Sequence, residues 1–195
     1  MRDVGFARTL VCVNAAVPLA LLGWDVAHGN LGANPVEFVL RSTGTLALVF
    51  LVLTLAVTPA RRLLGWHWLV KLRRALGLIA FGYACLHLSI YLVLDQSLNP
   101  VAIATDAVTR PFIAFGMLTF GFMVPLAYTS TDASVRRLGK RWGRIHRRIY
   151  WIAGFACLHY WLEVKADVWK PSFFIGAIGL LLFYRWVLIR RDTIR

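Results

Sequence analysis

Acidic residues and cysteines are both scarce in this sequence, and each scarcity narrows the class of protein. Nine of the 195 residues are Asp or Glu, against 22 Lys and Arg. Cys12, Cys85 and Cys157 are odd in number and lie in apolar runs, so they predict no disulfide framework and are interpreted as small buried hydrophobic residues. The first apolar run also lacks a small-residue cleavage site, which favours an uncleaved membrane span over a signal peptide.

Apolar side chains, in contrast, are abundant. Hydrophobic residues make up 59% of the chain, compared with roughly 45–50% in average soluble domains. Six apolar stretches have about the 17–25 residues with which a helix crosses the hydrocarbon of a bilayer; they cover residues 6–28, 42–58, 72–94, 112–130, 145–164 and 172–189. We therefore expect an all-α integral membrane protein, with six transmembrane helices in a single domain over residues 1–195.

Four prolines support this division of the chain. Pro59, Pro100, Pro111 and Pro171 fall between the predicted spans. At such positions a proline can begin or end a helix without removing an internal hydrogen bond.

The basic residues are distributed unevenly among the loops that would connect these spans. Lys165, Lys170, Arg41 and Arg110 lie on one side, and the remaining Lys and Arg lie on the side of the two termini. Because cytoplasmic loops are rich in Lys and Arg, both termini are predicted to be cytoplasmic. Topology in a lipid membrane thus explains the net charge of +13 without a nucleic-acid partner.

Two of the five histidines occupy equivalent positions in different predicted spans. His87 lies in the third span and His159 in the fifth, and both spans run from inside to outside, so the two imidazoles are expected at the same depth toward the outer leaflet. Residues 82–87 and 154–159 are identical at five of six positions when the chain is aligned with itself at an offset of 72 residues. The offset predicts that the two histidines share one environment.

Two imidazoles at one depth are suited to bind a haem iron from both sides. The small residues Gly and Ala before each histidine leave space for a flat macrocycle. Iron with two histidine ligands has no open coordination position, which favours electron transfer over oxygen chemistry. Two simpler interpretations stay open. The similarity of residues 82–87 and 154–159 could arise by chance from residues that are common in membrane helices, or the histidines could be proton-sensitive polar contacts of a transporter or assembly factor.

The same offset pairs His146 with Arg74 at the inner ends of these spans. Thirteen helical residues rise about 19.5 Å, so a second haem at His146 would lie beneath the first. Arg74 has no lone pair to offer iron, and a second haem would need another ligand, be five-coordinate, or be replaced by a different cofactor. Arg74, Arg144 and Arg147 are candidates to bind acidic groups of a cofactor, although topology alone also places basic residues there.

Weaker signals flank these positions. Tyr91 and Glu163 each follow an outer histidine by four residues, so each lies on the same helix face as its histidine and is a candidate for the outer edge of a haem or for interfacial anchoring. Residues 66–68, Trp-His-Trp, are typical of the membrane interface and alternatively predict a quinone or flavin pocket.

Several short motifs resemble the MsrQ family of haem-binding membrane subunits, a branch of the ferric-reductase-like transmembrane group. They extend along nearly the whole chain and comprise Arg41-Ser42-Thr43-Gly44, Thr58-Pro59, Arg73-Arg74-Ala75-Leu76-Gly77-Leu78, Leu86-His87-Leu88, and Arg137-Leu138-Gly139 followed by Trp142 and His146. The resemblance implies a ferric-reductase-like bundle in a bacterial inner membrane. It also implies that His87 and His159 ligate haem b, with His146 as a further family histidine near the inner face.

The resemblance implies partners as well. These are FMN as a further cofactor, a quinol pool or a cytosolic flavin reductase as electron donor, and a periplasmic molybdenum-cofactor methionine sulfoxide reductase as acceptor. The larger relatives have an inner ligand where this chain has Arg74, and they carry a cytosolic flavin and nicotinamide domain that is not expected here. The chain itself would then hold no sulfoxide-reducing site. A ferric-reductase-like or oxidase-like shuttle with metal or oxygen as acceptor is the related alternative.

Overall fold

The secondary structure of the described residues is entirely helical, in agreement with the expected all-α class. The computed structural model describes residues 4–164 and 166–193. Its elements in chain order are α1 (Val4–His28), α2 (Pro35–Leu64), the 3₁₀ helix η1 (His67–Leu72), α3 (Arg73–Ile90), the π-helical turn η2 (Tyr91–Asp95), α4 (Pro100–Thr109), α5 (Pro111–Tyr128), α6 (Asp132–Leu138), α7 (Lys140–His146), α8 (Ile149–Glu163) and α9 (Trp169–Thr193).

Five segments of the described chain are long and apolar enough to cross a membrane, namely α1, α2, the continuous run from η1 to η2, α5 and α9. The remaining predicted span corresponds to α8, which has 15 residues. At 1.5 Å per residue this helix is about 22 Å long, compared with about 30 Å of hydrocarbon. The structure therefore shows a multi-pass membrane protein with five evident spans, and the sixth crossing remains a prediction.

The fifth predicted span begins later than expected because the chain turns at Arg147 and Arg148, between α7 and α8. Helix α8 consequently begins at Ile149, and His146 is the last residue of α7.

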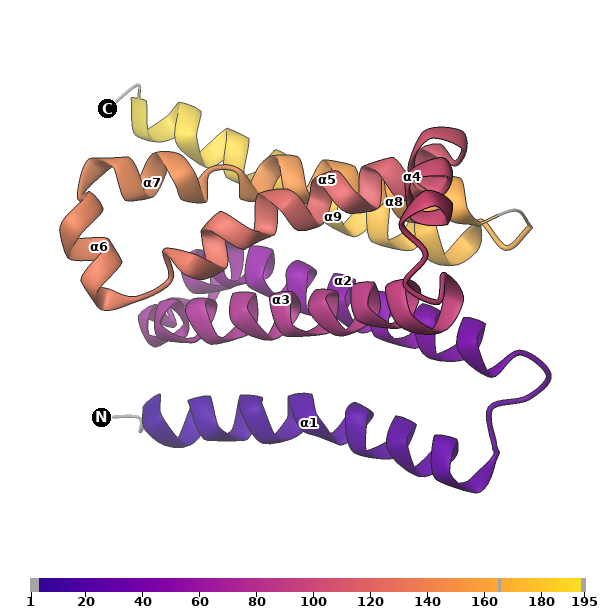
Figure 1. Cartoon of the computed structure of the whole chain (residues 1–195). Helices are drawn as coiled ribbons and strands as arrows, with labels where there is room; N and C mark the ends of the chain where they lie inside the picture. Colours follow the sequence, from indigo (N-terminus) through magenta and orange to yellow (C-terminus); the bar gives the residue numbers. More distant parts are fainter. Residues whose placement is uncertain (1–3, 165, 194–195) are drawn as a thin grey trace.

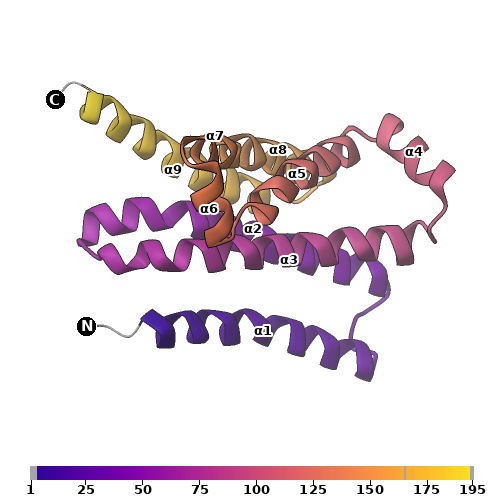
Figure 2. The same cartoon turned by 60° about the vertical axis from the view of Figure 1, so that its left-hand side comes forward.

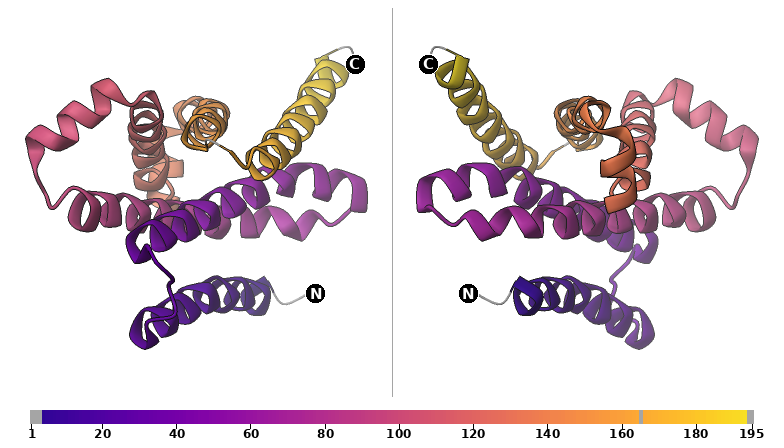
Figure 3. Two further views of the ribbon diagram at one scale, coloured as in Figure 1. Left: turned by 90° about the vertical axis from the view of Figure 1, so that its right-hand side faces the viewer. Right: turned by 90° about the vertical axis from the view of Figure 1, so that its left-hand side faces the viewer.

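Two antiparallel helix pairs form the centre of the molecule. In Figures 1 and 2, α2 runs beside α3 and α5 runs beside α8, and the two pairs lie against each other. Helix α9 packs on α2 and α8, whereas α1 packs on α3 and η1 along one side of the bundle (Figure 3). The basic helices α6 and α7 lie at the end of the bundle where α1 begins, and α4 lies at the opposite end (Figure 1). We refer to these as the basic end and the α4 end.

Local sequence explains where most of these helices begin and end. Pro100 and Pro111 are the first residues of α4 and α5, as expected from their place between apolar stretches. Asn99 caps α4 by accepting hydrogen bonds from the backbone N–H groups of residues 101 and 102, which satisfies two of the free donors of a helix start. At the end of α2, Gly65 adopts a positive φ of 68°, a conformation that favours glycine.

Pro59 differs from the other three expected helix boundaries, since it lies inside α2. A proline has no N–H, so the carbonyl of Leu55, four residues earlier, loses its helical donor. The Nη2 atom of Arg185 in α9 donates to this carbonyl at 2.7 Å and to Thr58 Oγ1 at 3.2 Å. A donor 130 residues away along the chain therefore lets α2 continue through Pro59 to Leu64.

The core lies between the helix pairs, where Leu55, Ala80, Ile152 and Ala153 are almost completely buried. Tyr83 fastens α1 to α3, because its hydroxyl donates to the carbonyl of Ala15 at 2.5 Å. Many large apolar side chains on the outside of the bundle are exposed, as expected for helices whose outer faces meet lipid.

Candidate functional site

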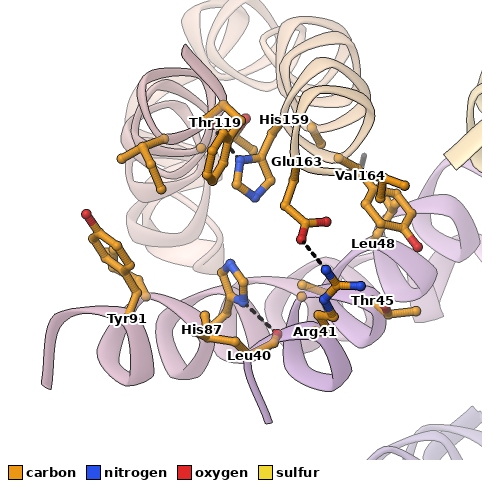
Figure 4. Close-up of a pocket in the computed structure, with 18 of the residues that line it drawn as sticks. Leu40, Arg41, Thr45, Leu48, His87, Tyr91, Thr119, His159, Glu163 and Val164 are labelled. Carbon is orange, nitrogen blue, oxygen red and sulfur yellow. Dashed lines mark hydrogen bonds and ion pairs between the residues drawn. The ribbon is translucent and has the colours of Figure 1, made fainter. Parts of the chain in front are cut away.

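The structure brings together the two histidines that the sequence places at matched depth. His87 projects from α3 and His159 from α8, and their ring centroids lie 6.1 Å apart with an interplanar angle of 83°. Figure 4 shows the two rings pointing toward one another across the space between the helix pairs. The pair therefore faces a common point from opposite sides.

A backbone carbonyl orients each imidazole. His87 Nδ1 lies 3.0 Å from the carbonyl oxygen of Leu40, and His159 Nδ1 lies 2.7 Å from that of Phe112. Since a carbonyl oxygen can only accept, Nδ1 carries the proton in both rings. The Nε2 atom of each neutral ring is then left with its lone pair available to a metal, an arrangement typical of metal-ligating histidines.

Glycine makes room for both rings. A Cβ atom at Gly44 of α2 would lie 2.9 Å from His87 Cε1, and one at Gly116 of α5 would lie 2.9 Å from His159 Nδ1. Side-chain carbons essentially never approach other heavy atoms this closely. A larger residue at either position would thus have to displace the imidazole.

The separation of the rings suits a metal ion between them. A ligating imidazole nitrogen lies about 2 Å from its metal and about 1 Å from its own ring centre, so two opposed ligands have centroids about 6 Å apart. Among the described residues, no group of three or more His, Cys, Asp or Glu side chains could hold a bare metal ion. The site offers two opposed imidazole nitrogens, a donor set that would fit the iron of a haem.

A large cavity surrounds the two rings. Its volume is about 1560 Å³, above the roughly 300–1,000 Å³ of common small-molecule pockets. Its walls include Leu48, Leu51, Phe120 and Met123 from α2 and α5. Ala84 and Ala156, three residues before the histidines, also line it, so the predicted room for a flat group is provided by the alanines.

The rim of the cavity at the α4 end is polar. Arg41 of α2 forms ion pairs with Glu37 at 2.9 Å and with Glu163 of α8 at 3.0 Å, the latter visible in Figure 4. Tyr91 also lines the cavity, and its hydroxyl lies 3.3 Å from Asp106 of α4. Tyr91 and Glu163 thus both line the cavity, and their place at the outer edge of a haem stays a prediction.

The inner candidates lie apart from this cavity, and none of them lines it. The His146 ring stacks on Trp142 with centroids 3.8 Å apart, and its Nδ1 lies 3.2 Å from the Trp142 carbonyl oxygen. Arg74 forms an ion pair with Asp132 at 2.7 Å. Arg144 and Arg147 are exposed. The structure therefore brings the outer histidines into one site, and the inner candidates lie outside it at the basic end.

The loop tryptophans also lie outside the cavity. Trp66 and Trp68 stack on each other with ring centroids 6.4 Å apart, and Trp66 is exposed whereas Trp68 is partly buried.

Some residues of the site escaped sequence reasoning. The carbonyls of Leu40 and Phe112 carry no side-chain signal, and Gly116 belongs to no recognised motif. The offset of 72 residues would have found it, because it relates Gly44 to Gly116 as it relates His87 to His159.

Comparison with known proteins agrees with this architecture. Residues 43–157 match the family described as ferric reductase like transmembrane component, a range that includes Gly44, His87 and Gly116 and stops two residues before His159. No solved structure is significantly similar to the chain.

Three bacterial relatives are each named protein-methionine-sulfoxide reductase heme-binding subunit MsrQ. The relative from Herminiimonas arsenicoxydans is 44% identical over 91% of this chain and 83% of its own length. The relative from Rhodospirillum rubrum is 48% identical over 92% of this chain and 87% of its own length. The relative from Ralstonia nicotianae is 45% identical over 96% and 87%, respectively. The chain therefore belongs to the ferric-reductase-like transmembrane family and, within it, to the MsrQ group.

Proposed function

We propose that this chain is the haem-binding, electron-transfer subunit of a methionine sulfoxide reductase system. The observation that carries the proposal is the pair of opposed imidazoles, His87 and His159, each with Nδ1 held by a carbonyl and 6.1 Å between ring centroids. Membership of a family of reductase transmembrane components and of haem-binding subunits supports a membrane electron-transfer role.

The residues present fit haem b. When bound, it supplies an iron that exchanges one electron at a time. His87 and His159 would hold that iron from both faces, while the carbonyls of Leu40 and Phe112 keep the two rings in one tautomer and make Nε2 a better ligand. Leu48, Leu51, Phe120 and Met123 would give the group an apolar surrounding, and an iron held by two histidines would favour electron transfer over oxygen chemistry.

The proposed direction of electron flow rests on the proposed membrane topology. In the proposed topology the basic end is cytoplasmic, and reducing equivalents from a quinol pool or a cytosolic flavin reductase enter near His146. Arg74, Arg144 and Arg147 are proposed to bind the phosphate of FMN or the propionates of a second haem there, since all are basic and lie at that end. Helix α8 supplies the sixth crossing in this topology.

Electrons leave at the α4 end, which faces the periplasm in this topology. The polar rim with Tyr91 and Glu163 is the proposed exit toward a periplasmic reductase that carries a molybdenum cofactor and repairs oxidised methionine. The chain itself would only pass electrons on. It would work as a multi-pass protein of a bacterial inner membrane.

The haem assignment is tested by purification in detergent and by spectra of the oxidised and dithionite-reduced protein. We expect about one low-spin haem per chain in the wild type, and loss of the low-spin spectrum in both His87→Ala and His159→Ala. His67→Ala is the matched control, because His67 is exposed and lies outside the cavity. A low-spin spectrum that survives both cavity substitutions, or a colourless wild type, overturns the assignment.

The acceptor is tested with the reduced wild type. Reoxidation should be fast with a periplasmic methionine sulfoxide reductase of the same organism and methionine sulfoxide, and slow with a ferric chelate or oxygen alone. Fast reoxidation by the ferric chelate or by oxygen, with none by the reductase, would instead favour the ferric-reductase-like or oxidase-like alternative.

A further inference from the structure

Arg185 is a buried cation that the haem site does not use. Arg185 is only 5% exposed, and it lies in α9, outside the cavity around His87 and His159. A guanidinium stays protonated, and burying its charge is costly unless an anion compensates it. An intramembrane charge of this kind is therefore expected to have a partner and a function.

The contacts of Arg185 satisfy its hydrogen bonds in part and leave its charge uncompensated. Its Nη2 atom donates to the Leu55 carbonyl and to Thr58 Oγ1, which explains how it supports α2 at Pro59. Its guanidinium carbon also lies 5.9 Å from the ring centre of Tyr150. Its Nε atom is buried without a hydrogen-bond partner, and no ion pair joins it to any described carboxylate.

A second cation lies within electrostatic range of Arg185. Arg73, the first residue of α3, is partly buried and lies within electrostatic range of both Arg185 and Tyr150. The two guanidinium groups repel each other, so their proximity makes the local excess of positive charge larger. Helices α2, α3, α8 and α9 all contribute to this cluster.

The other unpartnered buried groups are of the same kind. Among the described residues, the buried side-chain nitrogens or oxygens without a partner are Arg61 Nε, Trp68 Nε1 and Arg185 Nε. All three are donors, and they come from the last turns of α2, from η1 and from α9. The preference for positive charge on the cytoplasmic side explains exposed basic residues but does not explain buried donors without acceptors.

We propose that Arg185, Arg73 and Tyr150 form a binding site for a phosphate group. Phosphate has several acceptor oxygens and negative charge, and the planar fork of arginine binds it by two parallel hydrogen bonds. The source of the phosphate is either the phosphodiester of an anionic phospholipid or the phosphate monoester of a nucleotide such as FMN. The site is independent of the haem assignment, because none of its three residues lines the haem cavity.

The test uses the full chain, purified in neutral detergent and washed free of lipid. The melting midpoint is measured against increasing phosphatidylglycerol, FMN or inorganic phosphate, with phosphatidylcholine as the uncharged control lipid. In the wild type at least one phosphate probe should raise the midpoint. In Arg185→Met the apparent affinity for that probe should fall at least tenfold, and Arg185→Lys should be intermediate because it keeps the charge without the fork.

Arg141→Met is the matched control, since it removes one exposed positive charge at the same end and should bind like the wild type. An unchanged haem spectrum shows that Arg185→Met is folded; if it fails to fold, Arg73→Met takes its place and should show the same tenfold loss. A response confined to phosphatidylglycerol identifies a lipid site, and one confined to FMN identifies a nucleotide site. Equal binding by wild type and both cluster variants, or no response of the wild type to any phosphate probe, overturns the proposal.

Discussion

The helix pairs α2–α3 and α5–α8 are alike at the α4 end and different at the basic end. At the α4 end, each pair places a glycine against a histidine ring. In each pair the Nδ1 atom of that ring also contacts a backbone carbonyl, which belongs to the residue 47 positions before the histidine. At the basic end, the same offset of 72 residues relates Arg74, which pairs with Asp132, to His146, which stacks on Trp142.

The difference indicates what each end can bind. Two matching sets of ring, carbonyl and glycine offer the same kind of nitrogen from both sides, which suits a haem iron with two histidine ligands. An arginine opposite a histidine cannot do this, because a guanidinium has no lone pair for a metal. The basic end is suited instead to a ligand with one acidic side, such as a phosphate or a propionate.

The largest effect is expected from substitution of the glycines that pack against the two histidine rings, a feature that both helix pairs share. In Gly44→Ala or Gly116→Ala the new Cβ would lie 2.9 Å from the imidazole and displace it. Such overpacking typically costs about 1–3 kcal/mol, which corresponds to roughly fivefold to 150-fold weaker haem binding when it acts on the bound state alone. Haem titration of the apoprotein measures this loss.

The controls for these variants are Gly82→Ala in α3 and Gly121→Ala in α5, where an added Cβ meets no atom within 4 Å. Both should bind haem like the wild type. If the repeat is functional, the two cavity variants should lose affinity to a similar degree. Wild-type affinity in Gly116→Ala would break the equivalence of the two helix pairs.

The second largest effect is expected at the basic end, where the two helix pairs differ. His146→Ala should keep the low-spin spectrum of the haem between His87 and His159, because His146 does not line that cavity. It should lower the content of FMN or of a second haem, measured by pigment extraction per polypeptide. Unchanged amounts of both would remove His146 from the proposed path, whereas loss of the low-spin spectrum would contradict the separation of the two ends.

The sequence predicted what depends on local pattern and could not predict what depends on distant contacts. The all-α class and the facing histidines follow from apolar stretches and from an internal repeat, both of which are visible in one dimension. The continuation of α2 through Pro59 depends on Arg185, 130 residues beyond Leu55. The carbonyls of Leu40 and Phe112 likewise acquire their role only when α2 packs on α3 and α5 on α8.

A smaller effect is expected at the rim, where the ion pair between Arg41 and Glu163 links the two helix pairs at 3.0 Å. The side chains are 57% and 26% exposed, so solvent screens the pair and its contribution should be about 0.2–1 kcal/mol. The variants Arg41→Gln, Glu163→Gln and the double variant form a cycle that isolates this coupling from melting midpoints. A coupling free energy above about 2 kcal/mol would contradict this expectation, because it would show that the ion pair at the rim contributes strongly to holding the two helix pairs together.

The smallest effect is expected for Asp132 at the basic end. Its hydrogen bond and ion pair with Arg74 hold the pKa of its carboxyl below the ordinary value. A carboxyl with a lowered folded-state pKa stabilises the protein above its unfolded pKa of about 3.9, and this contribution disappears as the pH falls through the folded-state pKa. The carboxylate is exposed, so the wild type should melt only slightly above Asp132→Asn at pH 6, and the difference should vanish near pH 3. Arg74→Gln should behave like Asp132→Asn at both pH values, since either substitution removes the pair. A large difference in melting midpoint that persists near pH 3 would contradict this account, because it would mean that Asp132 stabilises the protein through something other than its charge.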